Sequence, residues 1–175
     1  MKTLLTILSF IALAQISNAD EQAIATAQSH LNSFLKRDIE ELAKSYAPKI
    51  MLMAGNEFLE EQYGLAKDGD SAAGLEVERG VHLAIMKKTS DGLYDQPVDQ
   101  IEELLESLEY QAIETKDGDF STTSPGRAGR SDGKLHFKIK AGDVLLKVSP
   151  KGKDYFLLLH LRKFDGSWKI FSECF

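Results

Sequence analysis

The most informative segment of this chain reads Asp154-Tyr-Phe-Leu-Leu-Leu-His-Leu-Arg-Lys-Phe-Asp-Gly-Ser-Trp-Lys-Ile-Phe-Ser-Glu-Cys-Phe175. Two runs rich in aromatic and aliphatic residues flank Asp165-Gly166, a pair that tolerates the positive φ angles of a tight hairpin turn. The segment therefore predicts a β-hairpin. Because a hairpin alone is only marginally stable in water, its apolar face needs a second layer, and amphipathic helices earlier in the chain can supply it.

A two-residue turn fixes the expected register of this hairpin. The expected cross-strand pairs are Lys163–Trp168, Leu161–Ile170, Leu159–Ser172 and Leu157–Cys174. Since cross-strand partners share a face, one face is nearly all apolar and is expected to meet the helices. That face consists of Tyr155, Leu157, Leu159, Leu161, Trp168, Ile170, Ser172 and Cys174.

The opposite face of the hairpin mixes large apolar groups with chargeable ones, and Glu173 and His160 are expected to point outward there. A face that met only solvent would not need three Phe and a Leu, so we predict a homodimer interface with an ionic component. A bulge would shift the register by one residue and weaken this assignment. The expected interface residues are Phe156, Leu158, His160, Phe171, Glu173 and Phe175.

The N-terminus has the pattern of a secretory signal peptide. Lys2 precedes an apolar run from Leu4 to Ile16, and Ser17-Asn-Ala19 provides small residues for cleavage before Asp20. We therefore expect residues 1–19 to be removed, leaving one domain over 20–175 in the periplasm or outside the cell. No membrane span is expected after the signal is removed.

Composition narrows the partners. The chain has 21 Lys and Arg against 27 Asp and Glu, a net charge of −6, which argues against nucleic acid or an anionic membrane as the main partner. The single cysteine, Cys174, can form no internal disulfide. It is interpreted as a small buried thiol, with a reactive or intermolecular cysteine as the alternative.

The order of elements predicts an α+β fold. A helical apolar stripe runs from Ile24 to Tyr46, with a break near Asp38, where Asp38 and Glu41 form a capping box. Further helices are expected near 56–66, over 75–88 with Val77, Val81, Ala84 and Ile85 inward, and over 98–108. Strands are expected over 49–53, 110–114, 134–140 and 144–148 and in the hairpin, and 121–133 is expected to be a loop. The helices should pack on one side of a curved antiparallel sheet.

Three segments together resemble the nuclear transport factor 2-like superfamily, most closely its SnoaL-like and putative lumazine-binding branches. They begin at Phe34-Leu-Lys-Arg-Asp, Ala141-Gly-Asp-Val and Tyr155-Phe-Leu-Leu, and the Asp165-Gly-Ser-Trp-Lys-Ile ending is the most specific of the motifs. The resemblance implies a cone-shaped, cystatin-like α+β barrel with a pocket at its wide end and a convex face that often dimerises. The superfamily includes steroid isomerases, dehydratases, epoxide hydrolases and polyketide cyclases as well as members without known activity, so fold alone does not settle function.

Catalytic and metal-binding residues are harder to find. On the predicted hairpin no carboxylate or histidine faces inward, Asp38 is explained as a helix cap, and His30 is expected on the solvated side of the first helix. His82 and His136 are interpreted as surface or interface groups. The histidines have no short ligand spacing, so no catalytic residue, metal or cofactor is assigned.

What remains is a candidate pocket. We predict that an apolar cavity with a few hydroxyls binds a small apolar molecule, with simple core filling as the alternative for the same side chains. The leading hypothesis is a secreted, non-catalytic, homodimeric pocket-forming domain. The alternatives are an enzyme of the isomerase, dehydratase or cyclase type and a structural or protein-interaction module. The expected ligand-binding residues are Tyr46, Met51, Met53, Tyr63, Trp168 and Ser172.

Overall fold

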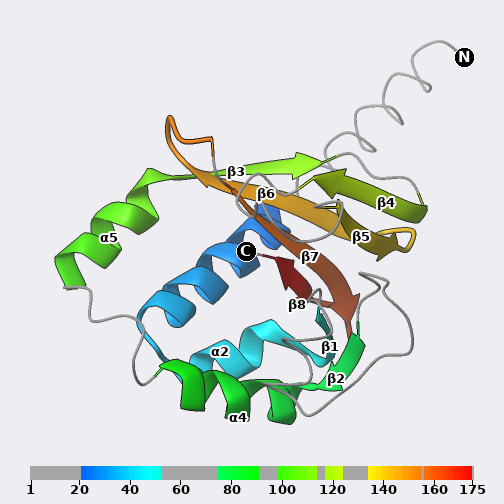
Figure 1. Ribbon diagram of the computed structural model, residues 1–175, viewed down its shortest axis with the longest axis horizontal. Coiled ribbons are helices and arrows are strands. Elements are labelled where there is room, and N and C mark those ends of the chain that lie inside the picture. The colour runs from blue at the N-terminus through cyan, green and yellow to red at the C-terminus, as the bar shows by residue number, and fades with distance from the viewer. Residues whose placement is uncertain are drawn as a thin grey trace, which may run out of the picture.

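In the computed structural model, structure is described for residues 21–52, 75–90, 98–113, 117–123, 134–154 and 156–174 (Figure 1). The expected signal peptide and the expected helix near 56–66 lie outside these ranges, so both stay predictions. Among the described helices, none has the length and apolar character needed to cross a bilayer.

The first helical segment is broken where the sequence predicts. A helix spans residues 21–35, the chain turns at Arg37, whose φ is 57°, and α2 runs over Ile39–Ser45. Asp38 caps α2, because its Oδ1 accepts a hydrogen bond from the backbone N–H of Glu41 at 3.0 Å. The two helical pieces can therefore pack at different angles on the same sheet.

The main sheet has six strands in the order β2-β1-β8-β7-β6-β3. Neighbouring strands are antiparallel except β1 and β8, which run parallel, so the sheet that was expected to be antiparallel is mixed. The strands are β1 Tyr46–Leu52, β2 Leu75–Glu78, β3 Leu108–Ile113, β6 Val144–Pro150, β7 Leu157–Phe164 and β8 Ser167–Cys174.

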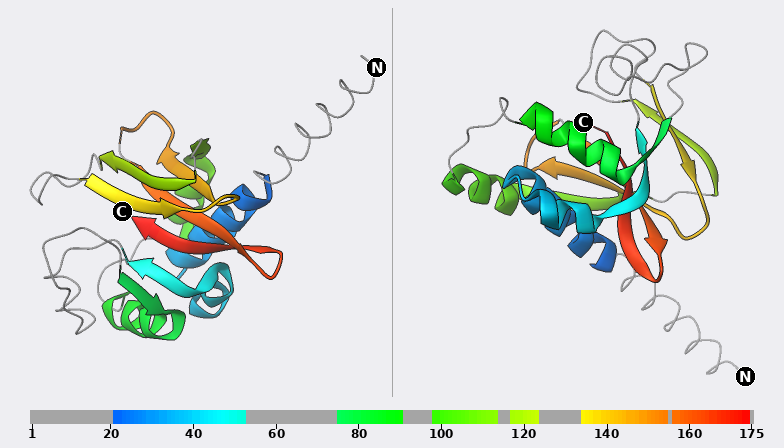
Figure 2. Two further views of the ribbon diagram at one scale, coloured as in Figure 1. Left: turned by 90° about the vertical axis from the view of Figure 1, so that its right-hand side faces the viewer. Right: turned by 90° about the horizontal axis from the view of Figure 1, so that it is seen from below.

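The sheet lies between two unequal layers (Figure 2). The N-terminal helix, α2, α4 (Arg79–Ser90) and α5 (Val98–Ser107) lie on one side, which we call the helix face. A two-stranded ribbon of β4 (Gly118–Thr123) and β5 (Lys134–Ile139) lies on the other, the outer face. This arrangement confirms the α+β class and the helices on one side of the sheet. Strand β5 agrees with the strand expected over 134–140, whereas β4 was not predicted and includes residues 121–123 of the expected loop.

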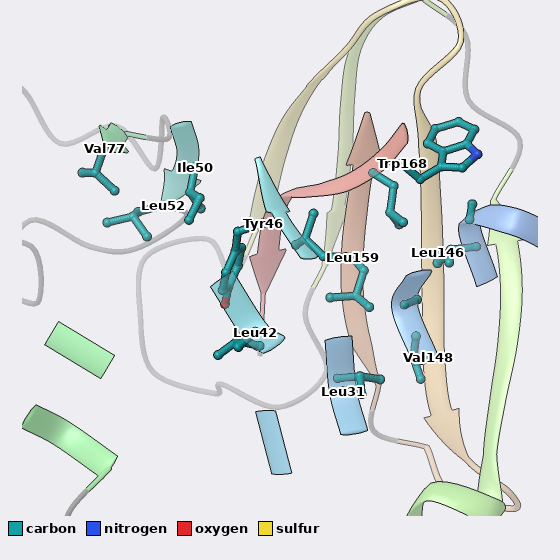
Figure 3. Packing of buried hydrophobic residues seen from close by; sticks show 14 residues of the cluster. Leu31, Leu42, Tyr46, Ile50, Leu52, Val77, Leu146, Val148, Leu159 and Trp168 are labelled. Atoms are coloured by element: carbon teal, nitrogen blue, oxygen red, sulfur yellow. The ribbon is translucent and has the colours of Figure 1, made fainter. Parts of the chain in front are cut away.

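The main core fills the space between the helices and the sheet. Leu31 of the N-terminal helix is gathered with Leu159 and Val148 of the neighbouring strands β7 and β6 (Figure 3). Trp168 and Ile170 of β8 belong to this core, as predicted. A second, smaller core on the outer face consists of Phe137, Ile139, Leu145 and Leu158.

The terminal hairpin forms with its predicted turn. Asp165 and Gly166 both have positive φ, 49° and 77°, and the pairs Lys163–Trp168 and Leu161–Ile170 are present. Beyond Ile170, however, the register shifts, and the expected pairs Leu159–Ser172 and Leu157–Cys174 are wrong. The observed pairs are His160–Ser172, Leu159–Glu173 and Leu158–Cys174.

The shift is a β-bulge, in which Phe171 is the additional residue. Because side chains alternate along a strand, one extra residue moves everything after it to the opposite face. Glu173, expected to point outward, therefore lies on the helix face beside Leu159, and Ser172 lies on the outer face beside His160.

The expected helix over 75–88 is only partly correct. Leu75–Glu78 is the edge strand β2, paired with β1, and the helix begins at Arg79. Val81 is 45% exposed instead of buried, and Ala84 is exposed as well. The core-facing residues of α4 are instead His82 and Met86, among others. Because the helix begins at Arg79 and not at Leu75, a different set of residues faces the core.

Candidate functional site

A buried carboxylate is the centre of the candidate site. The side chain of Glu173 is 7% exposed, and both of its oxygens are hydrogen-bonded. Oε2 lies 2.9 Å from His30 Nε2, and Oε1 accepts a hydrogen bond of 2.6 Å from the Tyr46 hydroxyl. His82 Nε2 lies 3.2 Å from the Tyr46 hydroxyl and 3.6 Å from Oε1. We call Glu173, His30, Ser45, Tyr46 and His82 the Glu173 cluster.

Each member of the Glu173 cluster comes from a different element. His30 lies on the N-terminal helix, Ser45 is the last residue of α2, Tyr46 is the first residue of β1, and His82 lies on α4. His30 and Tyr46 are fully buried, and His82 is 5% exposed. With β8, which carries Glu173, five elements therefore contribute to the cluster, and three of them contact the carboxylate directly.

His30 was expected to be solvated, and that expectation is wrong. Ala23, Ala27 and His30 follow one another at spacings of four and three residues, so all three lie on the core face of the helix. This spacing is visible in the sequence. The polarity of a histidine favours the solvated side of a helix, but the position of His30 in this spacing places it on the core face.

Hydrogen-bond geometry assigns the protons in this cluster. The Ser45 hydroxyl donates to the carbonyl oxygen of Leu42 at 2.7 Å, so its oxygen accepts from His30 Nδ1 at 2.8 Å. His30 Nε2 faces a carboxylate oxygen, which accepts. Both ring nitrogens of His30 therefore carry protons, which makes the contact with Glu173 an ion pair between imidazolium and carboxylate.

The charge state of Glu173 agrees with this assignment. Burial acts to raise the pKa of the carboxyl group, but the hydrogen bonds from His30 and His82 and the charges of these two histidines outweigh it. The pKa of Glu173 is therefore held well below its usual range. A carboxylate with so low a pKa is a weak base at neutral pH.

Ser45, His30 and Glu173 have the order of a nucleophile, a base and an acid, with contacts of 2.8 and 2.9 Å. The proton directions are opposite to those of an activated nucleophile, however. The Ser45 hydroxyl donates its hydrogen bond to the carbonyl oxygen of Leu42, and His30 donates to Ser45 instead of accepting from it. Ser45 is also 8% exposed. The geometry therefore does not support acyl transfer.

Half-buried apolar side chains lie beside the Glu173 cluster on the helix face. Tyr110 pairs with Val148, which pairs with Leu157, so these three form a row next to the row that contains Leu159 and Glu173. Burial raises the pKa of Tyr110 to about 12. We call this group the apolar rim: Phe34, Leu105, Leu108, Tyr110 and Leu157, which pack against the main core while remaining partly exposed.

A second buried carboxylate lies on the outer face. Asp143 accepts hydrogen bonds from His160 Nε2 at 2.8 Å, from Arg162 Nε and Nη2 at 2.9 and 2.7 Å, and from the backbone N–H of Lys140 at 2.8 Å. Burial acts to raise the pKa of Asp143, but these bonds outweigh it and the pKa lies below its usual range. The group ties the turn between β5 and β6 to β7, which is a structural role.

The predicted ligand-binding residues are dispersed. Tyr46 belongs to the Glu173 cluster, whereas Trp168 is 6% exposed and fills the core near the hairpin turn. Met51 pairs with Ser172, so both lie on the outer face. Met53 and Tyr63 fall outside the described ranges. Of the four described residues, only Tyr46 reaches the cluster.

The predicted dimer-interface residues are largely enclosed by their own chain. Leu158, His160 and Phe171 are 1%, 1% and 6% exposed. Phe137 and Ile139 of β5 cover Leu158 together with half-buried Phe156. The ribbon thus explains the apolar residues of the outer face without a second copy, Glu173 lies on the opposite face, and Phe175 is not described. A homodimer stays a prediction.

Metal coordination has no support in this part of the chain. Within the ranges given above, no three His, Cys, Asp or Glu side chains are arranged to hold a metal ion. The side chain of His136 lies outside this description.

No family model and no curated protein matches the chain. Among solved structures it is similar to a protein of unknown function with a cystatin-like fold from Nostoc punctiforme PCC 73102, with 9% identity and a TM-score of 0.38 over 88% of this chain and 86% of that one. It is also similar to an NTF2-like protein of unknown function from Pseudomonas putida KT2440, with 12% identity and a TM-score of 0.34 over 94% and 84% of the two chains. Both are likenesses of fold alone.

Proposed function

We propose that this chain is a non-catalytic domain that binds a small, largely apolar molecule on the helix face of its sheet. The observation that carries the proposal is the apolar rim. Its five residues come from the N-terminal helix, α5, β3 and β7 and remain partly exposed beside a closed core. Partly exposed apolar side chains that converge from several elements are typical of a site that an apolar ligand completes.

The charges near the rim favour a neutral ligand. Glu173 is paired with His30 at 2.9 Å, so the cluster presents no uncompensated carboxylate to a bound molecule. Tyr110 adds a phenol to the rim, and a phenol can donate or accept one hydrogen bond. A flat or aliphatic molecule with a single polar group fits this combination.

The geometry favours binding over catalysis. A general base needs a pKa near the working pH. Both Glu173 oxygens already accept hydrogen bonds, and the pKa of this carboxyl is well below its usual range. An enzyme of the isomerase, dehydratase or cyclase type stays the alternative, and the resemblance to the SnoaL-like branch stays a prediction.

The proposal includes export and, as a separate element, a homodimer. Export is supported by the signal-like residues 1–19. N-terminal sequencing of protein from its own host should begin at Asp20, and an intact Met1 would contradict export. Light scattering at micromolar concentration should give twice the mass of the mature chain if the dimer forms.

Ligand binding can be tested by filling the rim. Leu105→Trp enlarges a rim side chain, and we expect it to weaken binding of the neutral dye Nile red at least tenfold. Val81→Trp adds the same group at a position 45% exposed on α4 and should leave the affinity unchanged. Native mass spectrometry of protein from its own host should show a bound molecule that Leu105→Trp removes. Equal dye affinity in both variants and an empty native protein would contradict the proposal.

A further inference from the structure

The bulge in β8 destabilises the structure in several ways. The alternative is an unbulged strand, in which Leu159 would face Ser172 and Glu173 would point to the outer face. In the observed register the Ser172 hydroxyl is buried without a hydrogen-bond partner, and a carboxylate lies between the helices and the sheet. The bulge also disrupts the regular ladder between β7 and β8.

Contacts before the bulge do not distinguish the two registers. Leu161–Ile170 and Lys163–Trp168 are pairs in both. Phe171 lies on the outer face in both, where the Arg162 guanidinium is 4.0 Å and the His160 ring 5.3 Å from its ring centroid. Only the residues from Ser172 onward change sides.

What distinguishes the registers is the Glu173 cluster. In the observed register the carboxylate receives hydrogen bonds from His30 and Tyr46, with His82 3.6 Å away, and Leu52 of β1 lies opposite Glu173. In the unbulged register these buried donors would face Ser172 or no acceptor. A buried ion pair seldom adds much net stability, but it can select one arrangement over another, because the wrong arrangement leaves its partner unpaired.

We propose that the His30–Glu173 ion pair, supported by Tyr46, is a register lock that holds the C-terminal half of β8 in its bulged register. Without the lock, β8 can slip by one residue, which removes the carboxylate from the helix face. The inference depends on the strand pairing alone and not on the proposed ligand. Glu173 acts here as a positioning residue.

The experiment measures register directly, by cross-strand Hα–Hα contacts in the NMR spectrum of the full chain. Wild type should show the contact between residues 159 and 173. In Glu173→Gln, which keeps the volume but removes the charge, and in Glu173→Ala, we expect the contact between residues 159 and 172 to appear, with at least a tenfold rise in the slipped population.

The control removes the other buried carboxylate. Asp143 is also bound by a histidine, at 2.8 Å, but its β7 partners His160 and Arg162 lie on the outer face beside Phe171, which stays on that face in both registers. Asp143→Asn should therefore lower stability while keeping the contact between residues 159 and 173. If Glu173→Ala does not fold, His30→Gln supplies the same test from the opposite side of the ion pair.

Two results would overturn the proposal. The first is that every foldable variant of the ion pair keeps residue 173 opposite residue 159, so that the bulge forms without the lock. The second is that Asp143→Asn changes the register as much as Glu173→Gln does, which would make slipping a general effect of lower stability.

Discussion

The hydroxyl of Tyr46 lies between Glu173 and His82 in the Glu173 cluster. Tyr46→Phe therefore tests the cluster by removing a single oxygen atom. The hydroxyl donates to Glu173 at 2.6 Å and lies 3.2 Å from His82 Nε2. A hydrogen bond to a charged group contributes about 1.5–3 kcal/mol. The removed atom leaves little cavity, so we expect a loss of about 1.5–3 kcal/mol in the free energy of unfolding.

Urea denaturation can measure this loss, because Trp168 is the only tryptophan and is 6% exposed in the folded chain. Its fluorescence should report unfolding of the main core. Tyr110→Phe is the matched control, since it removes only the hydroxyl group of a half-buried tyrosine on β3, and we expect it to cost about 1 kcal/mol or less. A loss below about 0.5 kcal/mol for Tyr46→Phe, or equal losses for both variants, would refute the reasoning that the cluster is a tight, buried network.

Three further predictions concern other parts of the fold. The pKa values of Glu173 and Asp143 are lowered from their usual 4.5 and 3.8, so the unfolded chain takes up protons first as the solution becomes acidic. Their stabilisation should be complete above about pH 5 and lost as the pH falls below the usual values; a urea midpoint unchanged between pH 7 and 3.5 would contradict this. Gly166→Ala should cost about 1–2 kcal/mol, because φ is 77° there while no atom lies within 4 Å of the added Cβ. Gly80→Ala, on helix α4 with equal space, should instead stabilise by about 0.5–1 kcal/mol; the same sign for both would contradict the conformational explanation. Phe171→Asp should lower the free energy of unfolding by about 3 kcal/mol or more, because Phe171 is 6% exposed and stacked on Arg162. If light scattering and urea titration show a fully stable monomer instead, the burial of Phe171 within one chain is contradicted.

Local patterns predicted those elements whose geometry depends on a few consecutive residues. The Asp165-Gly166 turn depends on backbone preferences at two positions, and both have the expected positive φ. The Asp38 cap depends on one hydrogen bond to the backbone N–H of Glu41 three residues later. Neither feature needs information from another part of the chain, and the sequence was sufficient for both.

The apolar outer face shows where a local pattern can be explained in two ways. The hairpin sequence correctly predicts that Leu158 and Phe171 are covered, since both are buried. Whether a second copy or the same chain covers such a face depends on where β5 goes. Phe137 and Ile139 cover Leu158, and a turn of a few residues before β6 brings them there. A hairpin sequence carries no information about that path.

By itself, then, the sequence determined the α+β class, the helix break, the hairpin turn and the apolar face that carries Trp168 and Ile170. Only the tertiary structure decided the side on which Glu173 lies. A shift of one residue in β8 changes few local contacts, so strand propensity and alternation cannot choose between the two registers. The choice falls to His30 and Tyr46, which reach Glu173 from 143 and 127 residues away along the chain and meet it only after the helices have packed on the sheet.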